Sequence, residues 1–133
     1  MGQTRESGAA ARDYGYQMAT AVATFLGATL LGSRSNEALW EGQRIVIKYA
    51  RHRTPEIGVS NAMLERVDSV VVSLESDTGD YMLYRVRPTW YQQEMIPSRS
   101  RSPSANSVMM VPCQRVREAG EVIGLMPKNE VKI

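Results

Sequence analysis

The sequence predicts a mixed α/β protein in which helices flank a central mixed β-sheet of about five strands. Three observations lead there: an amphipathic segment near the N-terminus, a β-branched alternating segment at residues 44–50, and two apolar segments joined by turn-forming residues. With 133 residues, 43% of them hydrophobic and 23% charged, the chain is long enough for one domain with a real core. Helices covering the faces of a sheet suit this order of elements.

The N-terminal part is expected to contain a flexible segment and then a long helix. Residues 1–12 form the flexible segment, and Asp13 is able to cap the helix. Apolar residues recur at helical spacing from Met18 onward, and Gly32 is expected to end the helix. A loop, a short strand near residues 39–40 and a tight turn follow.

Residues 44–50 give the clearest strand, because this segment is rich in β-branched residues and its residues alternate in character. Alternation places Ile45, Ile47 and Tyr49 on one face of this strand. The opposite face then carries Arg44, Val46, Lys48 and Ala50.

The rest of the domain is expected to alternate short elements. Residues 51–60 are interpreted as a loop that ends at Ser60, which caps a helix. Two strands are expected to form a hairpin around residues 76–80. The expected elements are a helix over 61–68, strands over 70–75 and 81–87, a helical turn over 89–95, a strand over 108–111 and a helix over 114–119. One domain then covers residues 13–126, and residues 127–133 form a loose tail.

Basic residues gather in two stretches, although the net charge is only +2. Residues 44–53 contain no acid, and residues 85–101 contain one. Local basic patches can steer a polyanion even on a nearly neutral protein. Solvated arginines without a ligand are the alternative interpretation. If the patches bind nucleic acid, the expected contacts are Arg51, His52, Arg53, Arg99 and Arg101.

Aromatic residues concentrate between residues 81 and 91, beside two arginines. Aromatic rings interleaved with arginine suit stacking on single-stranded nucleic acid. The same residues also fit an ordinary strand with core-facing aromatics, and the usual burial of such side chains favours that interpretation.

Cysteine use and hydropathy indicate a cytoplasmic protein with no membrane partner. Cys113 is the only cysteine, so neither an internal disulfide nor a thiolate metal cluster can form. The apolar run over residues 18–31 is shorter than the roughly 20 residues that span a bilayer. Acids as well as arginines precede it, unlike in a secretory signal.

Lysine is scarce in this chain, which has thirteen arginines and three lysines. Lys48 lies within the clearest strand, whereas Lys128 and Lys132 lie in the expected tail. A lysine is a compact point charge whose pKa shifts readily on burial. Lys48 is therefore either used for chemistry or reaches solvent from a strand edge along its apolar stem.

The segment from Asn36 to Lys48, NEALWEGQRIVIK, resembles the active-site motif of the restriction-endonuclease-like (PD-(D/E)xK nuclease) superfamily. In that family, one strand carries a first acid and the next strand carries acid-x-Lys. The acids help to hold Mg²⁺, and the lysine orients or activates the attacking water. The resemblance covers about residues 13–91, and it implies a restriction-endonuclease-like fold with Lys48 and Glu37 at the active face.

One position departs from this motif, because Val46 stands two residues before Lys48 where the family has an acid. In some members the second acid lies on the following helix. Glu65 takes that place here, and Asp68 lies three residues further on, which puts both on one helical face. The resemblance thus implies Glu37 and Glu65 as the magnesium ligands, although solvated carboxylates are the plainer interpretation of both.

Two functions remain open at this point. The first is a Mg²⁺-dependent phosphodiesterase or endonuclease acting on nucleic acid, DNA rather than RNA, with Lys48, Glu37 and Glu65 as catalytic residues. Such a small domain is expected to cut a duplex as a homodimer, since one site handles one phosphodiester at a time. The alternative is an inactive nuclease-like fold that binds nucleic acid or a protein partner, and Val46 favours this alternative.

Overall fold

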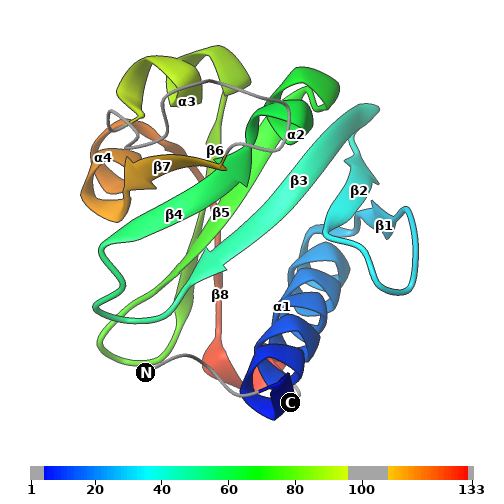
Figure 1. Cartoon of the computed structure of the whole chain (residues 1–133). Coiled ribbons are helices and arrows are strands. Elements are labelled where there is room, and N and C mark those ends of the chain that lie inside the picture. Colours follow the sequence, from blue (N-terminus) through cyan, green and yellow to red (C-terminus); the bar gives the residue numbers. More distant parts are fainter. Residues whose placement is uncertain (1–4, 96–107, 132–133) are drawn as a thin grey trace.

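The computed structural model describes residues 5–95 and 108–131, and within them the fold is mixed α/β, as the sequence predicts. The described residues form four α-helices, a six-stranded mixed sheet and a separate two-stranded sheet (Figure 1). Among the described helices, none combines the length and apolar character that crossing a bilayer requires.

Helix α1 spans Arg5–Leu26, so it both begins and ends earlier than the sequence predicts. Gly27 ends it with a φ of 74°, in the left-handed region that glycine adopts without strain. The Gly27 N–H donates to the carbonyl of Thr24 at 3.2 Å, and the Ala28 N–H donates to that of Ala23 at 2.8 Å. This pair of hydrogen bonds is a Schellman motif, which satisfies carbonyls that the helix end leaves open.

The main sheet is mixed, with β3 and β5 parallel and every other pair of neighbours antiparallel. A two-residue turn joins β2 to β3, and its residues Glu41 and Gly42 have φ values of 50° and 75°, which fit a type I′ turn. In spatial order, the strands are β1 (Thr29–Leu30), β2 (Glu37–Trp40), β3 (Gln43–Ala50), β5 (Ser69–Glu75), β6 (Tyr81–Val86) and β8 (Glu121–Met126).

The loop prediction for residues 51–60 is wrong in its second half, because β4 (Glu56–Ser60) pairs with β7 (Val108–Pro112). Gly58 weakens the strand signal in the sequence, because glycine is uncommon inside strands. The same residue allows β4 to pair with β7. A Cβ added there would lie 2.5 Å from Cγ1 of Val108. Strand β8 was likewise not expected.

The remaining helices lie close to their expected positions. They are α2 (Asn61–Arg66), α3 (Pro88–Glu94) and α4 (Cys113–Ala119). A 3₁₀ turn, η1 (Lys128–Glu130), lies in the segment that the sequence predicts to be a loose tail. Ser60 caps α2 as predicted, because its Oγ accepts the N–H of Met63 at 3.2 Å.

Two apolar clusters hold the layers together, one on each face of the main sheet. Helix α1 covers one face and buries Ile45 and Ile47 of β3. The β4–β7 sheet and the shorter helices cover the other face, where Val46 and Ala50 are buried (Figure 1). The two faces of β3 therefore match the predicted alternation.

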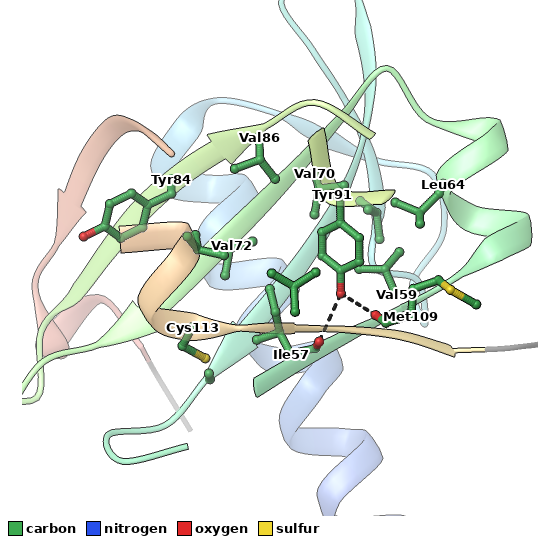
Figure 2. Close-up of a cluster of buried hydrophobic side chains, with 14 of the residues drawn as sticks. Ile57, Val59, Leu64, Val70, Val72, Tyr84, Val86, Tyr91, Met109 and Cys113 are labelled. Atoms are coloured by element: carbon green, nitrogen blue, oxygen red, sulfur yellow. Dashed lines mark hydrogen bonds between the residues drawn. The ribbon is translucent and has the colours of Figure 1, made fainter. Parts of the chain in front are cut away.

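Tyr91 of α3 ties β4 to β7 from within the second cluster (Figure 2). Its hydroxyl lies 2.6 Å from the carbonyl oxygen of Met109 and 3.0 Å from that of Ile57. Tyr81 and Tyr84 are also buried. These three tyrosines follow the core interpretation rather than the stacking-platform interpretation.

Candidate functional site

The edge of β3 opens where its pairing with β2 stops. Glu37 opposes Val46 in the last register pair of this hairpin, and the Ile47 N–H then donates to the carbonyl of Asn36 at 2.7 Å. Beyond this point β3 keeps β5 as its neighbour on the other side. A cavity of about 500 Å³ lies along the opened stretch, and its lining includes Tyr16, Asn36, Lys48, Thr54, Glu56 and Gly58. We call it the Lys48 cavity.

Lys48 is half-buried on β3, between two fully buried neighbours on the same face, Val46 and Ala50. Burial lowers the pKa of its ammonium group below the usual value. Within the described part of the chain, no carboxylate forms an ion pair with it. A partly desolvated cation without a partner charge favours an anionic ligand, and such perturbed groups in clefts mark candidate sites.

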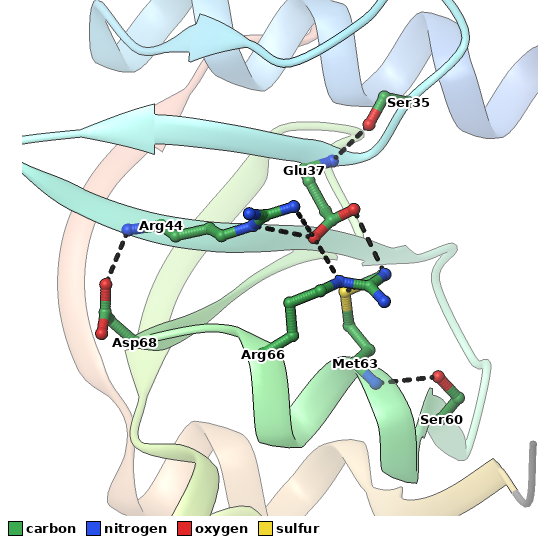
Figure 3. A network of polar contacts seen from close by, with 7 residues as sticks. All are labelled: Ser35, Glu37, Arg44, Ser60, Met63, Arg66 and Asp68. Atoms are coloured by element: carbon green, nitrogen blue, oxygen red, sulfur yellow. Dashed lines mark hydrogen bonds and ion pairs between the residues drawn. The ribbon is translucent and has the colours of Figure 1, made fainter. Parts of the chain in front are cut away.

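The carboxylate of Glu37 is not free to act as a metal ligand, because two guanidinium groups already bind it (Figure 3). Arg66 of α2 donates to Oε1 at 2.9 Å and to Oε2 at 3.3 Å, and Arg44 Nε donates to Oε1 at 3.1 Å. Burial alone would raise the pKa of Glu37, but the hydrogen bonds and charges of Arg66 and Arg44 outweigh it and lower the pKa. Glu37 is therefore an ionised carboxylate whose charge is neutralised within the protein.

The predicted metal ligands are not brought together by the described contacts. Glu65 is exposed on α2, while its neighbour Arg66 is the α2 residue that reaches Glu37. Val46, opposite Glu37, is fully buried and offers no oxygen. Among the side chains that the structure describes, those of residues 13–95 and 108–131, no group of three or more acidic, histidine or cysteine side chains is placed to share an ion. Magnesium binding by Glu37 and Glu65 stays a prediction that the fold alone does not test.

The donor set around Glu37 does not suit Mg²⁺. This ion needs near-octahedral oxygen coordination and one or two free carboxylates. Here the nearest positive charges to the Glu37 carboxylate belong to Arg44 and Arg66, and a cation entering there would have to displace them. The Glu37 carboxylate is therefore unsuited to hold Mg²⁺ while both arginines bind it.

The predicted nucleic-acid contacts fall into three groups. Arg51 is exposed but engaged, because its Nε lies 3.4 Å from Glu75 and its guanidinium lies 5.1 Å from the centre of the Tyr14 ring. His52 and Arg53 are exposed in the β3–β4 loop, residues 51–55. Arg99 and Arg101 lie outside the described residues.

Glu56 and Asn36 line the Lys48 cavity, although sequence reasoning assigned them no role. Sequence reasoning missed Glu56 because it interpreted this segment as a loop. In the structure, Glu56 is the first residue of β4 and lines the cavity together with residues of β3. The alternation of polar and apolar residues over Glu56–Ser60 was the available signal. The cavity thus contains an amine, a carboxylate and an amide without a direct ion pair between Lys48 and Glu56.

No protein-family model matches this chain, and no curated protein is significantly similar to it. The interpretation of the Lys48 cavity therefore depends on its own residues.

Proposed function

We propose that this chain is a nucleic-acid-binding module on a nuclease-like sheet, and that it binds the phosphate backbone at the Lys48 cavity and the adjoining β3–β4 loop. The observation that carries the proposal is the half-buried Lys48 ammonium, which lines a cavity of about 500 Å³ and has no carboxylate partner among the described residues. An anion entering this cavity would supply the missing charge. Phosphate is the anion that nucleic acids present at every nucleotide.

The neighbouring loop supports the same ligand. His52 and Arg53 follow Lys48 closely in the chain, and both are exposed. Thr54 lines the cavity itself and joins these residues to it. A lysine in a cavity, next to a loop with an exposed arginine and an exposed histidine, is suited to contact the phosphate backbone of the ligand. Such contacts position the ligand without reading its sequence. We therefore expect salt-dependent binding with little sequence preference.

Binding without hydrolysis agrees with the surroundings of Glu37. The resemblance to PD-(D/E)xK nucleases places Glu37 and Lys48 on successive strands, and they do share one face of the β2–β3 hairpin. However, Arg44 and Arg66 occupy the carboxylate that would hold a metal. Lys48 thus stands where the motif has its lysine, whereas the charge of Glu37, at the position of the first acid, is neutralised by the two arginines. A cytoplasmic location, with Cys113 as a buried thiol, belongs to the same proposal.

Metal-dependent cleavage is the second candidate, and the position of Lys48 favours it. An amine with a lowered pKa, on the same face as Glu37, is suited to orient or deprotonate a water molecule. Cleavage would require a carboxylate released from its arginine partners. It predicts hydrolysis of DNA with Mg²⁺ or Mn²⁺, which binding alone does not.

The test compares Lys48→Met with Lys128→Ala in DNA binding measured by fluorescence anisotropy over a series of salt concentrations. Lys48→Met keeps the apolar stem and removes the charge, whereas Lys128 is exposed on η1 and does not line the Lys48 cavity. We expect Lys48→Met to weaken binding roughly tenfold and to reduce the salt slope by about one. Equal binding by the two variants and the wild type, or no binding by the wild type, would overturn the proposal.

Incubating plasmid and single-stranded DNA with Mg²⁺ or Mn²⁺ decides between the two candidates. We expect intact DNA after incubation with the wild-type protein. Cleavage that Lys48→Met abolishes and Lys128→Ala retains would replace the binding proposal with the second candidate.

A further inference from the structure

A second cavity, of about 540 Å³, lies beside the β3–β4 loop. Thr54 lines both this cavity and the Lys48 cavity, so the two adjoin at the loop. Part of its wall is apolar and comes from the main sheet, and another part carries cationic side chains. The apolar part consists of Leu74, Met82 and Tyr84, and the cationic part consists of Arg53 and Arg117; His52 also lines the cavity.

The cationic part is not neutralised by the described residues. Neither Arg53 nor Arg117 forms an ion pair with a described carboxylate. Glu75 also lines the cavity, but its Oε1 already accepts the backbone N–H of His52 at 2.8 Å and pairs with Arg51 at 3.4 Å. The remaining acid in the lining is Asp77 of the β5–β6 turn. The cavity therefore has free guanidinium groups next to an apolar surface.

Arg53 has a φ of 73°, a left-handed conformation that is strained for a residue with a side chain. Glycine would adopt this conformation without strain. The chain thus holds an arginine at a loop position where its backbone favours glycine, and the side chain lines a cavity there. Sparsely populated backbone conformations concentrate at ligand-binding positions.

We propose that this cavity binds one unpaired base of a single-stranded nucleic acid, while Arg53 and Arg117 bind the adjacent phosphates. The proposal rests on the nucleic-acid binding proposed above and adds its substrate class. A base has an apolar face that suits the half-buried Met82, and the largely buried Leu74 and Tyr84 add only small parts of their side chains to this wall. A guanidinium pairs well with phosphate. In a duplex, stacked neighbours cover both faces of each base, so the cavity selects an unstacked one. Its volume falls within the usual range for small-ligand pockets, about 300–1,000 Å³.

The experiment measures the affinity of a labelled single-stranded oligonucleotide and of a duplex of the same composition by fluorescence anisotropy. Arg53→Gly removes one phosphate contact and relieves the backbone strain, so this variant should fold at least as well as the wild type. Arg117→Ser removes the second contact. Arg115→Ser is the matched control, because Arg115 lies on the same helix but pairs with Glu94 at 3.5 Å and does not line the cavity.

We expect Arg53→Gly and Arg117→Ser each to weaken single-strand binding about fivefold to tenfold, with a smaller effect on the duplex. Arg115→Ser should behave as the wild type. An oligonucleotide of the same length with abasic sites keeps its phosphates, so it should bind the wild type more weakly than the intact single strand does.

Three results would overturn this inference. One is equal affinity of the wild type for abasic and intact strands. Another is an equal loss of single-strand affinity in Arg115→Ser and Arg117→Ser. The third is normal single-strand binding by Arg53→Gly and Arg117→Ser while Lys48→Met loses binding, which would leave the proposed function standing. If the wild type binds no oligonucleotide at all, the proposed function fails and this inference fails with it.

Discussion

Glu37 and Val46 lie directly opposite each other on neighbouring antiparallel strands. Opposed residues of such a pair have their Cβ atoms about 4.5–5.5 Å apart on one face, which is a suitable separation for two side chains to share an ion. Here one of the two is a buried valine, and the other is held by Arg44 and Arg66. A pair position that could hold a metal instead holds an ion-pair network and a core residue.

Glu37→Gln should destabilise the fold by about 1 kcal/mol at neutral pH. The change removes the charge from hydrogen bonds to Arg44 and Arg66, and the partial exposure of both arginine side chains (42% and 45%) limits the loss. Urea unfolding of the wild type and the variant measures the difference. Equal stability of the two proteins would show that the network adds nothing to the fold.

Lowering the pH should remove the contribution of the Glu37 carboxylate to the stability of the fold. Because the folded state lowers the pKa of Glu37 below its reference value of 4.5, the stabilisation is present above about pH 4.5 and is lost as the pH falls through the folded pKa. The gap in unfolding free energy between wild type and Glu37→Gln should therefore narrow in this range. A gap that stays constant from pH 7 to pH 3 would contradict the assignment.

Val46→Asp should destabilise the fold by about 3 kcal/mol or more, because it buries a carboxylate opposite the carboxylate of Glu37. Val46→Thr is the matched control, since it keeps the branched shape and adds no charge, and it should cost less, about 1–2 kcal/mol. Chemical denaturation compares the two. If Val46→Asp is as stable as Val46→Thr, the position tolerates an acid, and a metal site at this pair becomes credible again.

Strand β3 could be predicted from the sequence because its signal is local. Alternation over residues 44–50 gives both the strand and its faces, and the buried Ile45 and Val46 lie on opposite faces as expected. By contrast, β4 and β8 contain Gly58 and Gly124, which weaken the strand signal. Their glycines are explained only by distant partners: a Cβ on Gly124 would lie 2.9 Å from Phe25 of α1.

The candidate site was only partly predictable for the same reason. The face on which Lys48 lies follows from alternation, and the scarcity of lysine in a chain rich in arginine marks Lys48 as a candidate site residue. The pairing of Glu37 with Arg66 joins residues far apart in the chain, and the placement of Glu56 beside the Lys48 cavity depends on β7 pairing with β4. The spacing of residues in the sequence cannot predict these contacts, because they form only when distant parts of the chain pack together.

The end of α1 gives a prediction with a matched pair of glycines. Gly27→Ala should cost about 1 kcal/mol, because Gly27 has a φ of 74° and alanine is strained there, although an added Cβ would meet no atom within 4 Å. Gly32→Ala should be nearly neutral, because Gly32 does not have a positive φ and an added Cβ would lie 3.6 Å from Ser35. Thermal unfolding measures both. The reverse order of stabilities would place the helix end at Gly32, as the sequence first suggested.

Lys48→Met should stabilise the folded protein even though it weakens ligand binding. Burial lowers the pKa of Lys48, so the folded state disfavours the charged amine, and this penalty is fully present at neutral pH. As the pH rises from the folded pKa toward the unfolded value of 10.5, the penalty disappears. The gain of the variant should therefore be about 1 kcal/mol at pH 7, or roughly 4 °C in Tm, and should shrink by pH 10. Lys128→Ala, at an exposed position, should show no such pH dependence. A Lys48→Met protein that is less stable than the wild type at pH 7 would mean that the ammonium has a stabilising partner within the fold.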